Sequence, residues 1–227
     1  LLIFLSVIAY AQTDTLIWSS TGTYPDISTA GQYNESVVLG DTLYAHITGG
    51  AATTTIEKYV IGDPSLGGGS WITGTPLPGA LVGGFMVECG GLIYYIGGSA
   101  TGVTTAGSDV YCYDPANGQW TTKAPLPVAL SGHGAVAWGD SVIFVMGGPW
   151  TTTTTTNLDV YYYRVATDTW GTNTGASGLP SGAGRRAFGI GIDGSSIIIS
   201  GGYAAAYLQS TYLGTIGADA TSITWAQ

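Results

Sequence analysis

Residues able to do acid–base, nucleophilic or metal chemistry are few in this sequence and lie far apart. Of 227 residues, two are histidines, His46 and His133, and two are cysteines, Cys89 and Cys112. A zinc site needs about four such ligands at short spacings, and a Ser-His-Asp site needs a base beside its nucleophile and an acid that orients the base. These residues form neither set, so we expect no catalytic residue, no metal and no cofactor.

Two adjacent arginines are the strongest polar candidates. Arg185 and Arg186 are two of only five basic residues in the chain. A guanidinium binds a carboxylate through two parallel hydrogen bonds, so either arginine could hold an anionic ligand, with Glu35 completing a polar site. The alternative is that the arginines only tie neighbouring loops together.

The composition limits the partners. The net charge is −9, and charged residues make up only 8% of the chain. Such a chain lacks the basic surface that neutralises nucleic-acid phosphates or holds an anionic bilayer, so we expect neither nucleic acid nor membrane insertion. The 37 glycines and 11% aromatic residues favour many short strands joined by tight turns.

Residues 1–11 form an apolar run that ends in Ala9-Tyr10-Ala11 and is followed by polar Gln12. The run is too short to cross a bilayer, and an A-x-A ending is typical of a secretory cleavage site. We therefore expect a signal-peptide remnant and an exported protein, whether periplasmic, extracellular or on the cell surface. The alternative is a buried first strand.

The rest of the chain, residues 12–227, repeats with a period near 50. Double glycines end four apolar runs, with first members 48, 50 and 54 residues apart: Gly49-Gly50, Gly97-Gly98, Gly147-Gly148 and Gly201-Gly202. Five tryptophans recur with nearly the same period, at spacings of 53, 49, 50 and 55 residues: Trp18, Trp71, Trp120, Trp170 and Trp225. This period in a strand-rich chain predicts four-stranded blades around a common axis, an all-β propeller. The units span roughly 32–75, 82–124, 131–174 and 185–227.

The third unit gives the clearest strand pattern. Residues 134–138 and 141–146 form a hairpin across Gly139-Asp140, residues 159–165 form a third strand, and Trp170 lies in a fourth. The matching first turns are Gly40-Asp41, Gly90-Gly91 and Asp193-Gly194, which tolerate positive φ.

Three features resemble the kelch repeat: the glycine pair after strand two, a tyrosine seven residues before the tryptophan, and a following Pro-Leu-Pro. The tyrosine–tryptophan pairs are Tyr113 with Trp120 and Tyr163 with Trp170, and the proline segments are 75–78 and 124–127. The third segment has only Leu179-Pro180. The resemblance implies a kelch-type β-propeller in which the repeated glycines, tyrosines and tryptophans are structural.

Trp18 occupies a fourth-strand position before the first whole unit begins. We therefore expect an incomplete ring in a fragment of a longer, bacterial-type protein, with further blades or domains beyond Gln227, most simply completing six blades. The alternative is a four-bladed ring with a loose N-terminal strand.

Long loops at one end of such a propeller define the expected binding face. The candidate ligand-binding residues are Trp150, Tyr203, Tyr207, Arg185, Arg186, Glu35 and His133. The threonines of the same loops (53–55, 104–105 and 151–156) are expected to be solvated. Kelch-like sequences often carry a histidine near the start of strand one, which favours a structural role for His133.

We expect a non-catalytic module that binds a protein, peptide or glycan through this face. The alternative is an enzyme that resembles sialic acid epimerases, with Arg185, Arg186, Glu35 and His133 around a central funnel. A galactose oxidase-like enzyme is disfavoured, because its paired histidines and tyrosine–cysteine crosslink cannot be placed.

The two cysteines are expected to stay unpaired. Cys89 falls in strand one and Cys112 in strand three of the same unit. Two strand spacings of about 4.8 Å exceed the roughly 7 Å limit between Cα atoms of a disulfide, so the sequence predicts two buried thiols.

Overall fold

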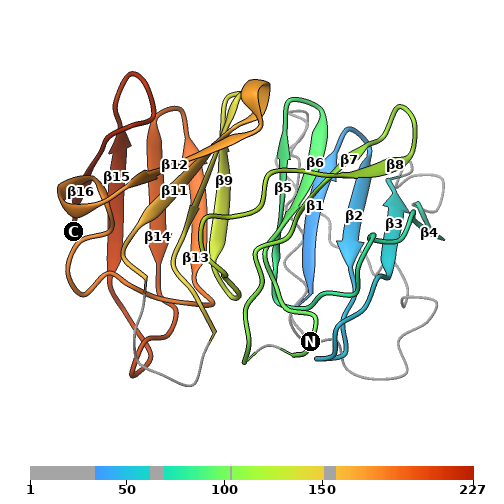
Figure 1. Ribbon diagram of the computed structural model, residues 1–227, viewed down its shortest axis with the longest axis horizontal. Helices are drawn as coiled ribbons and strands as arrows, with labels where there is room; N and C mark the ends of the chain where they lie inside the picture. The colour runs from blue at the N-terminus through green and yellow to red at the C-terminus, as the bar shows by residue number, and fades with distance from the viewer. Residues whose placement is uncertain (1–33, 62–68, 103, 151–156) are drawn as a thin grey trace, which may run out of the picture.

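The computed structural model describes residues 34–61, 69–102, 104–150 and 157–227, and they form an all-β fold (Figure 1). Their strands make four antiparallel sheets of four strands each. Two short 3-10 helices within the described residues, Val165–Thr167 and Gly175–Ser177, lie between strands. Within these ranges no helix is long and apolar enough to cross a membrane. The predicted signal remnant and Trp18 lie outside the described residues.

Each sheet is one blade, and its strands follow chain order. Blade 1 holds β1 (Glu35–Leu39), β2 (Thr42–His46), β3 (Ile56–Val60) and β4 (Ser70–Thr73). Blade 2 holds β5 (Phe85–Cys89), β6 (Leu92–Ile96), β7 (Val110–Asp114) and β8 (Gln119–Thr122). Blade 3 holds β9 (Gly134–Trp138), β10 (Val142–Met146), β11 (Val160–Arg164) and β12 (Thr169–Asn173). Blade 4 holds β13 (Gly189–Asp193), β14 (Ser196–Ser200), β15 (Thr211–Ile216) and β16 (Ile223–Ala226).

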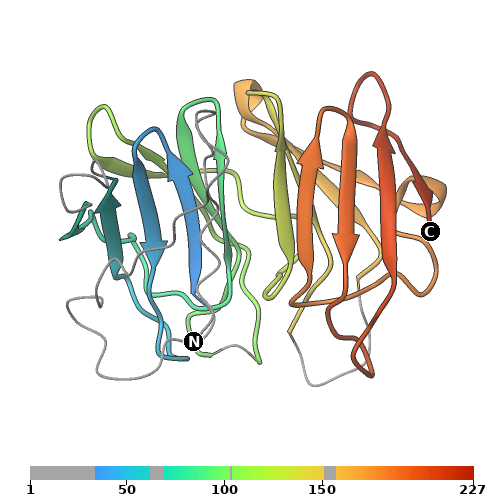
Figure 2. The same cartoon turned by 180° about the vertical axis from the view of Figure 1, so that it is seen from behind.

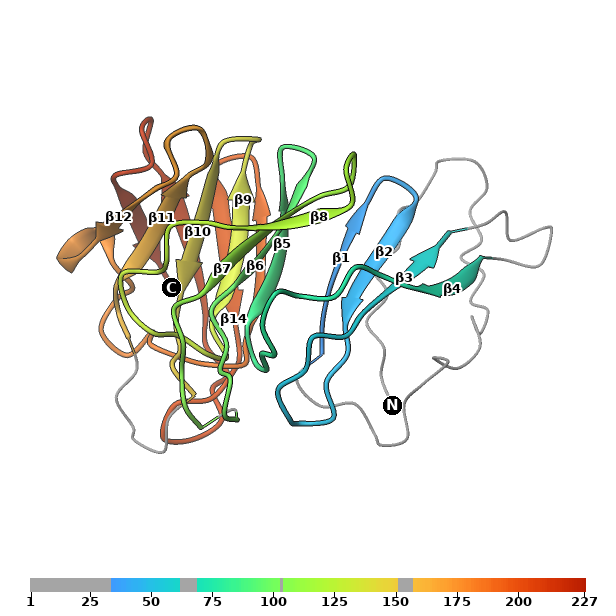
Figure 3. The same cartoon turned by 45° about the vertical axis from the view of Figure 1, so that its right-hand side comes forward.

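The first strands of the blades lie side by side, β1 next to β5, β5 next to β9 and β9 next to β13. Figure 3 shows how the sheets fan outward from this inner row. The architecture confirms the predicted β-propeller. The four blades fall inside the four units expected from the repeat.

The hairpin turns between the first and second strands use residues that accept positive φ. Gly40 and Gly139 open two of these turns with φ of 57° and 56°. In blade 4 the turn comes one residue later than Asp193-Gly194, because Asp193 still pairs with Ser196 at the end of the ladder. The turn residues there are Gly194 and Ser195.

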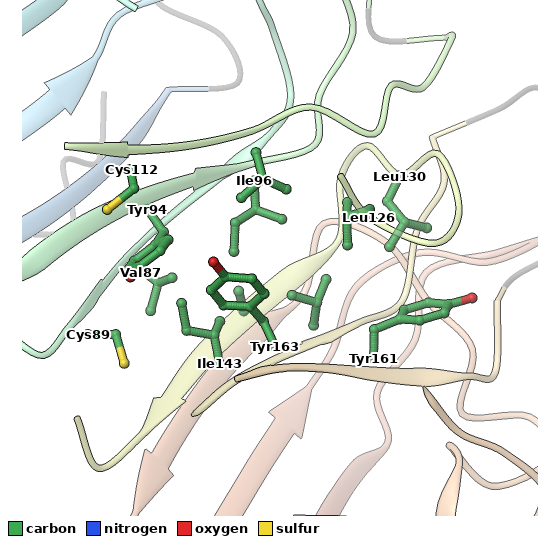
Figure 4. Packing of buried hydrophobic residues seen from close by; sticks show 13 residues of the cluster. Val87, Cys89, Tyr94, Ile96, Cys112, Leu126, Leu130, Ile143, Tyr161 and Tyr163 are labelled. Atoms are coloured by element: carbon green, nitrogen blue, oxygen red, sulfur yellow. The ribbon is translucent and has the colours of Figure 1, made fainter. Parts of the chain in front are cut away.

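Apolar side chains from facing sheets fill the space between blades. Figure 4 shows the layer between blades 2 and 3, where Tyr94 of β6 faces Ile143 and Tyr163 of blade 3. The rings of Tyr94 and Tyr163 lie 5.8 Å apart, nearly edge to face. The Tyr163 hydroxyl donates a 2.6 Å hydrogen bond to Asp168, which lowers the pKa of that carboxyl.

Tryptophans fasten blades 2 and 3 to the segments that precede them. The Trp120 indole donates to the carbonyl of Thr75 at 3.0 Å, and the Trp170 indole donates to that of Ala124 at 2.8 Å. These carbonyls begin the two Pro-Leu-Pro segments. Blade 4 follows a segment that lacks this motif, and the Trp225 indole nitrogen is buried with no hydrogen-bond partner among the described residues.

The glycine pairs allow backbones to meet at the end of each second strand. Gly97 and Gly98 both have positive φ, at 64° and 89°. A Cβ on Gly97 would meet the Leu130 carbonyl of the next blade, and a Cβ on Gly98 would meet Gly84 of its own blade. The Gly98 amide donates to the same Leu130 carbonyl at 2.9 Å. This pair therefore joins two blades at one point, and so does Gly147-Gly148, where the Gly148 amide donates to the Arg185 carbonyl at 2.9 Å.

One face of blade 4 is open. Figure 2 shows this sheet in front, with blade 3 behind it. Ile190, Ile197 and Tyr212 pack toward blade 3, whereas alternate residues such as Ile198 and Leu213 are exposed. The open face carries glycine, serine and threonine at most other positions.

The two cysteines lie in β5 and β7, with β6 between them. Both thiols are free and buried. Burial raises the pKa of Cys89 to about 12 and also raises that of Cys112, so both remain protonated at neutral pH.

Candidate functional site

Three loops at the junction of blades 3 and 4 bring four of the candidate residues together. Trp150 follows β10, Arg186 precedes β13, and Tyr203 and Tyr207 lie between β14 and β15. These loops are at one end of the propeller, because they leave second strands or enter first strands. The long-loop face of the sequence prediction therefore includes this junction.

The Arg186 guanidinium lies over two aromatic rings. Its central carbon is 5.2 Å from the ring of Trp150 and 4.7 Å from that of Tyr203. The Tyr203 ring in turn meets Tyr207 edge to face, with centroids 5.3 Å apart. A cation at these distances is attracted by the electron-rich ring faces, so Arg186, Trp150 and Tyr203 hold one another in place.

Backbone hydrogen bonds fix the segment under these side chains. Arg186 and Tyr203 exchange a pair of them, at 3.0 and 2.9 Å. Gly202, with φ of 92°, lets the two segments approach, because a Cβ there would meet the Arg186 carbonyl. The Leu208 amide donates to the Gly202 carbonyl at 2.9 Å and closes the loop that carries Tyr207.

Trp150 is held from the blade 3 side. Its amide donates to the Ser131 hydroxyl at 3.0 Å. Its ring lies against Gly132, where a Cβ would strike the indole. The Gly132 carbonyl accepts a 2.9 Å hydrogen bond from Ala187 of the segment leading into blade 4. The aromatic ring therefore rests on the point where the two blades are bonded together.

These side chains surround a pocket of about 390 Å³, which we call the arginine–aromatic pocket. Its lining residues are Trp150, Arg186, Ala187, Gly202, Tyr203, Tyr207 and Leu208. Arg186 is the charged residue of this lining, and none of the seven is acidic. Tyr207 is 88% exposed, which leaves a large aromatic surface beside the opening.

Arg185 is placed differently from its neighbour. Its side chain is fully buried, and its guanidinium donates to the carbonyls of Ala183, Gly201 and Ser210 at 2.8–2.9 Å. It also lies 5.0 Å from the Tyr212 ring. These bonds join the start of blade 4 to its long loop, so we assign Arg185 to the scaffold rather than to a ligand site.

Glu35 and His133 do not line the arginine–aromatic pocket. Glu35 lies opposite His46 in the backbone ladder between β1 and β2. The His46 ring lies 4.9 Å from that of Tyr95. Burial raises the pKa of Glu35 to about 8 and lowers that of His46 to about 4. His133 is buried 6.3 Å from the Phe85 ring, and burial lowers its pKa to about 4. The polar site expected from Glu35 and an arginine is therefore not assembled here.

The described threonines of the long loops form hydrogen bonds with other residues of the protein. The Thr53 hydroxyl accepts a 3.1 Å hydrogen bond from the Thr55 amide and shares a 2.9 Å hydrogen bond with the Thr55 hydroxyl, and the Thr53 backbone pairs with Leu81. The hydroxyl of Thr105 contacts those of Ser99 and Thr101. Residues 151–156 lie outside the described part of the chain. That described part contains no group of three or more His, Cys, Asp or Glu side chains placed to hold a metal ion.

Three residues of the pocket lining were absent from the sequence-based candidates: Ala187, Gly202 and Leu208. Ala187 lies next to Arg186, and Gly202 is itself the second glycine of a repeated pair, which the sequence singled out as structural. The positions of Arg186 and of the glycine pair could therefore have pointed to Ala187 and Gly202 as lining residues. Leu208 gave none, because its position depends on how the loop closes.

Comparison with known proteins agrees with the blade pattern. A family model described as the kelch motif matches residues 82–127, which include blade 2. Kelch-like protein 35 of Mus musculus is 35% identical over 74 residues, which are 32% of this chain and 12% of that protein. Kelch repeat and BTB domain-containing protein 8 of Danio rerio is 31% identical over 77 residues, 33% of this chain and 13% of that protein.

A solved structure has the same fold. The structure of YjhT superimposes with a TM-score of 0.71 at 15% identity, covering 89% of this chain and 66% of that one. The matches span about an eighth of the two curated relatives and just under two thirds of YjhT. Blade 2 thus carries a kelch motif, and the four successive blades of the described residues have the fold of a kelch-type β-propeller.

Proposed function

We propose that this chain is a non-catalytic binding module that holds part of a partner protein, a peptide or a glycan in the arginine–aromatic pocket. One observation carries the proposal: the Arg186 guanidinium lies over the rings of Trp150 and Tyr203 beside the exposed ring of Tyr207. Tryptophan, tyrosine and arginine are the residue types that contribute most to binding energy at protein interfaces.

The exposure, stacking and volume of the arginine–aromatic pocket support a binding role. An aromatic ring 88% exposed to water gains free energy when a partner covers it, at roughly 25 cal/mol per Å² of apolar surface. Stacking of Arg186 on two rings and the backbone pairing beneath it limit the freedom that these side chains lose on binding. The pocket volume of about 390 Å³ falls within the range of small-ligand sites, roughly 300–1,000 Å³.

The enzyme alternative gains no support from the arrangement of its candidates. Arg185 is enclosed by carbonyl groups, His133 is buried, and Glu35 lies in blade 1 outside the pocket lining. Among the described residues, the lining offers no carboxylate, imidazole or thiol that could exchange a proton at neutral pH. A binding role needs none of these groups.

The proposal is tested by screening the purified protein against a peptide array and a glycan array. Tyr207→Ala and Trp150→Ala should each weaken every specific signal, because both remove aromatic contact area. Leu213→Ala is the matched control, since it truncates an exposed apolar side chain on the open face of blade 4. Binding that survives both pocket changes, with all variants folded by circular dichroism, would contradict the proposed site.

A further inference from the structure

We infer that Asn34 accepts an N-linked glycan when the chain passes through a secretory pathway that carries out this modification. Three observations support this assignment: the sequence Asn34-Glu35-Ser36, the exposure of its first and third residues, and the hydrogen bond that holds the Asn34 side chain. Asn34 lies at the start of blade 1 and is not among the residues that line the arginine–aromatic pocket.

The acceptor sequence occurs once in the chain. N-linked transfer requires an asparagine followed two residues later by serine or threonine, with any residue except proline between them. The chain has four asparagines, and the other three are followed at that position by glutamine, aspartate and glycine: Asn117, Asn157 and Asn173. We therefore expect a single glycan at a single position.

The fold leaves this acceptor sequence accessible. Asn34 immediately precedes β1, and Asn34 and Ser36 are both exposed, whereas Glu35 between them is half-buried. Extended backbone directs alternate side chains to the same side, so the amide and the hydroxyl lie on one side of the strand and the carboxyl on the other. An N-linked glycan is bulky and hydrated and must remain on the surface of the folded protein. The position of Asn34 meets this condition.

One hydrogen bond fixes the Asn34 amide through its oxygen. The Oδ1 atom accepts from the Thr48 backbone amide at 2.8 Å. Among the described residues, the Nδ2 atom has no hydrogen-bond acceptor. A glycan is attached through Nδ2 and leaves the carbonyl oxygen in place, so the glycosylated side chain keeps its bond to Thr48. Attachment is therefore compatible with the native arrangement of blade 1.

The transfer is a substitution at the first sugar of a lipid-linked oligosaccharide. The Nδ2 atom of Asn34 forms a bond to C1 of that sugar while the bond from C1 to the lipid pyrophosphate breaks. The amide nitrogen loses one proton, and the lipid pyrophosphate is the leaving group. The oligosaccharide donor and the transferase belong to the secretory pathway, and this chain supplies the acceptor amide.

The test expresses the full chain behind a secretory leader in a eukaryotic host and analyses the secreted protein before and after digestion with peptide N-glycosidase. We expect digestion to shift the protein to lower mass and to convert the asparagine at position 34 to aspartate, which peptide mass spectrometry detects. Ser36→Ala should lose the glycan completely while keeping the bond between Asn34 and Thr48. Asn34→Gln should lose the glycan as well, but it also alters that hydrogen bond.

Gln119→Thr is the matched control, because it creates a second acceptor at Asn117 in the exposed turn between β7 and β8. This variant should carry two glycans. The inference is wrong if Gln119→Thr carries a glycan at Asn117 and none at Asn34, or if the unsubstituted chain is not shifted in the same host. It is also wrong if Ser36→Ala, shown by circular dichroism to be folded, keeps its glycan. None of these outcomes bears on ligand binding in the arginine–aromatic pocket.

Discussion

Arg185 and Arg186 are neighbours in the chain but belong to two different regions of the molecule. Arg185 is fully buried, with its guanidinium bonded to three backbone carbonyls and the Ser210 hydroxyl. Arg186 is half-buried and lies over Trp150 and Tyr203 at the opening of a pocket. Extended backbone turns successive side chains to opposite sides, so one arginine enters the blade and the other faces outward.

The difference shows what burial does to the same chemical group. Desolvation by burial lowers the pKa of Arg185, and its buried guanidinium must be satisfied by acceptors inside the fold. At Arg186 the rings provide attraction while the guanidinium remains next to a space that a ligand can enter. We therefore expect one arginine to control stability and the other to control recognition.

The strongest test of this comparison is Arg185→Gln. The shorter side chain would leave the carbonyls of Gly201 and Ser210 without their donor, so we expect a loss of about 3–5 kcal/mol in the free energy of unfolding. Arg186→Gln should cost less than about 1 kcal/mol. Urea denaturation of both variants gives the two values, and equal losses would break the comparison.

The glycine that carries the pocket backbone offers a second test. Gly202→Ala forces an unfavourable φ and drives a Cβ against the Arg186 carbonyl, which should destabilise the protein by about 2–3 kcal/mol and weaken ligand binding. Gly182→Ala is the control: Gly182 also has positive φ, but a Cβ there would meet nothing within 4 Å. Its cost should be about 1 kcal/mol, without an effect on the ligand. A similar loss at both positions would mean that the close approach adds nothing.

Glu35 extends the comparison to an acidic group in blade 1. Its pKa is raised to about 8 by burial, so between pH 4.5 and 8 the folded protein holds a proton that the unfolded chain releases. Stability contributed by the protonated carboxyl is present below pH 4.5 and declines as the pH rises through 8. His46, with a pKa lowered to about 4, acts in the opposite sense below pH 6.5.

Glu35→Gln should therefore remove the alkaline part of this dependence. We expect the variant to gain about 1–2 kcal/mol over the unmodified protein at pH 8.5 and to differ little from it at pH 4.5. Thermal unfolding across this range measures both. A difference that does not change with pH would show that Glu35 is not held neutral by burial.

The smallest expected effect separates two tryptophans of the repeat. Trp170→Phe removes the hydrogen bond to the Ala124 carbonyl, whereas the Trp225 indole has no such bond in the described structure. Both substitutions lose similar apolar area, so Trp170→Phe should cost about 1 kcal/mol more than Trp225→Phe. Chemical denaturation of the pair resolves this difference. The reverse order would indicate that the Pro-Leu-Pro segment does not strengthen its blade junction.

The blades were predictable because their signals are local. Glycine pairs, turn residues and the tryptophan spacing each report geometry within one repeat. The turn at Gly194 was displaced by one residue because ladder pairing of Asp193 and Ser196, rather than residue type, decides where the strand ends.

The candidate site was predictable only in part. Strand alternation placed Trp150, Arg186, Tyr203 and Tyr207 on one end of the propeller, and these four do line one pocket. The sequence could not decide which arginine is buried, because that depends on Ser210, 25 residues farther along the chain. It could not place Glu35 either, since no local pattern records the distance between blades 1 and 4.

The arginine–aromatic pocket draws its walls from two separate sheets, with Trp150 contributed by blade 3 and Tyr203 by blade 4. In a repeat architecture each unit is supported mainly by its immediate neighbours, so one unit can loosen while distant ones stay intact. An occupant of the pocket would bridge this seam and hold blade 4 against blade 3. Protection of β13–β16 from hydrogen exchange would then rise with ligand concentration, while β1–β4 would exchange as before.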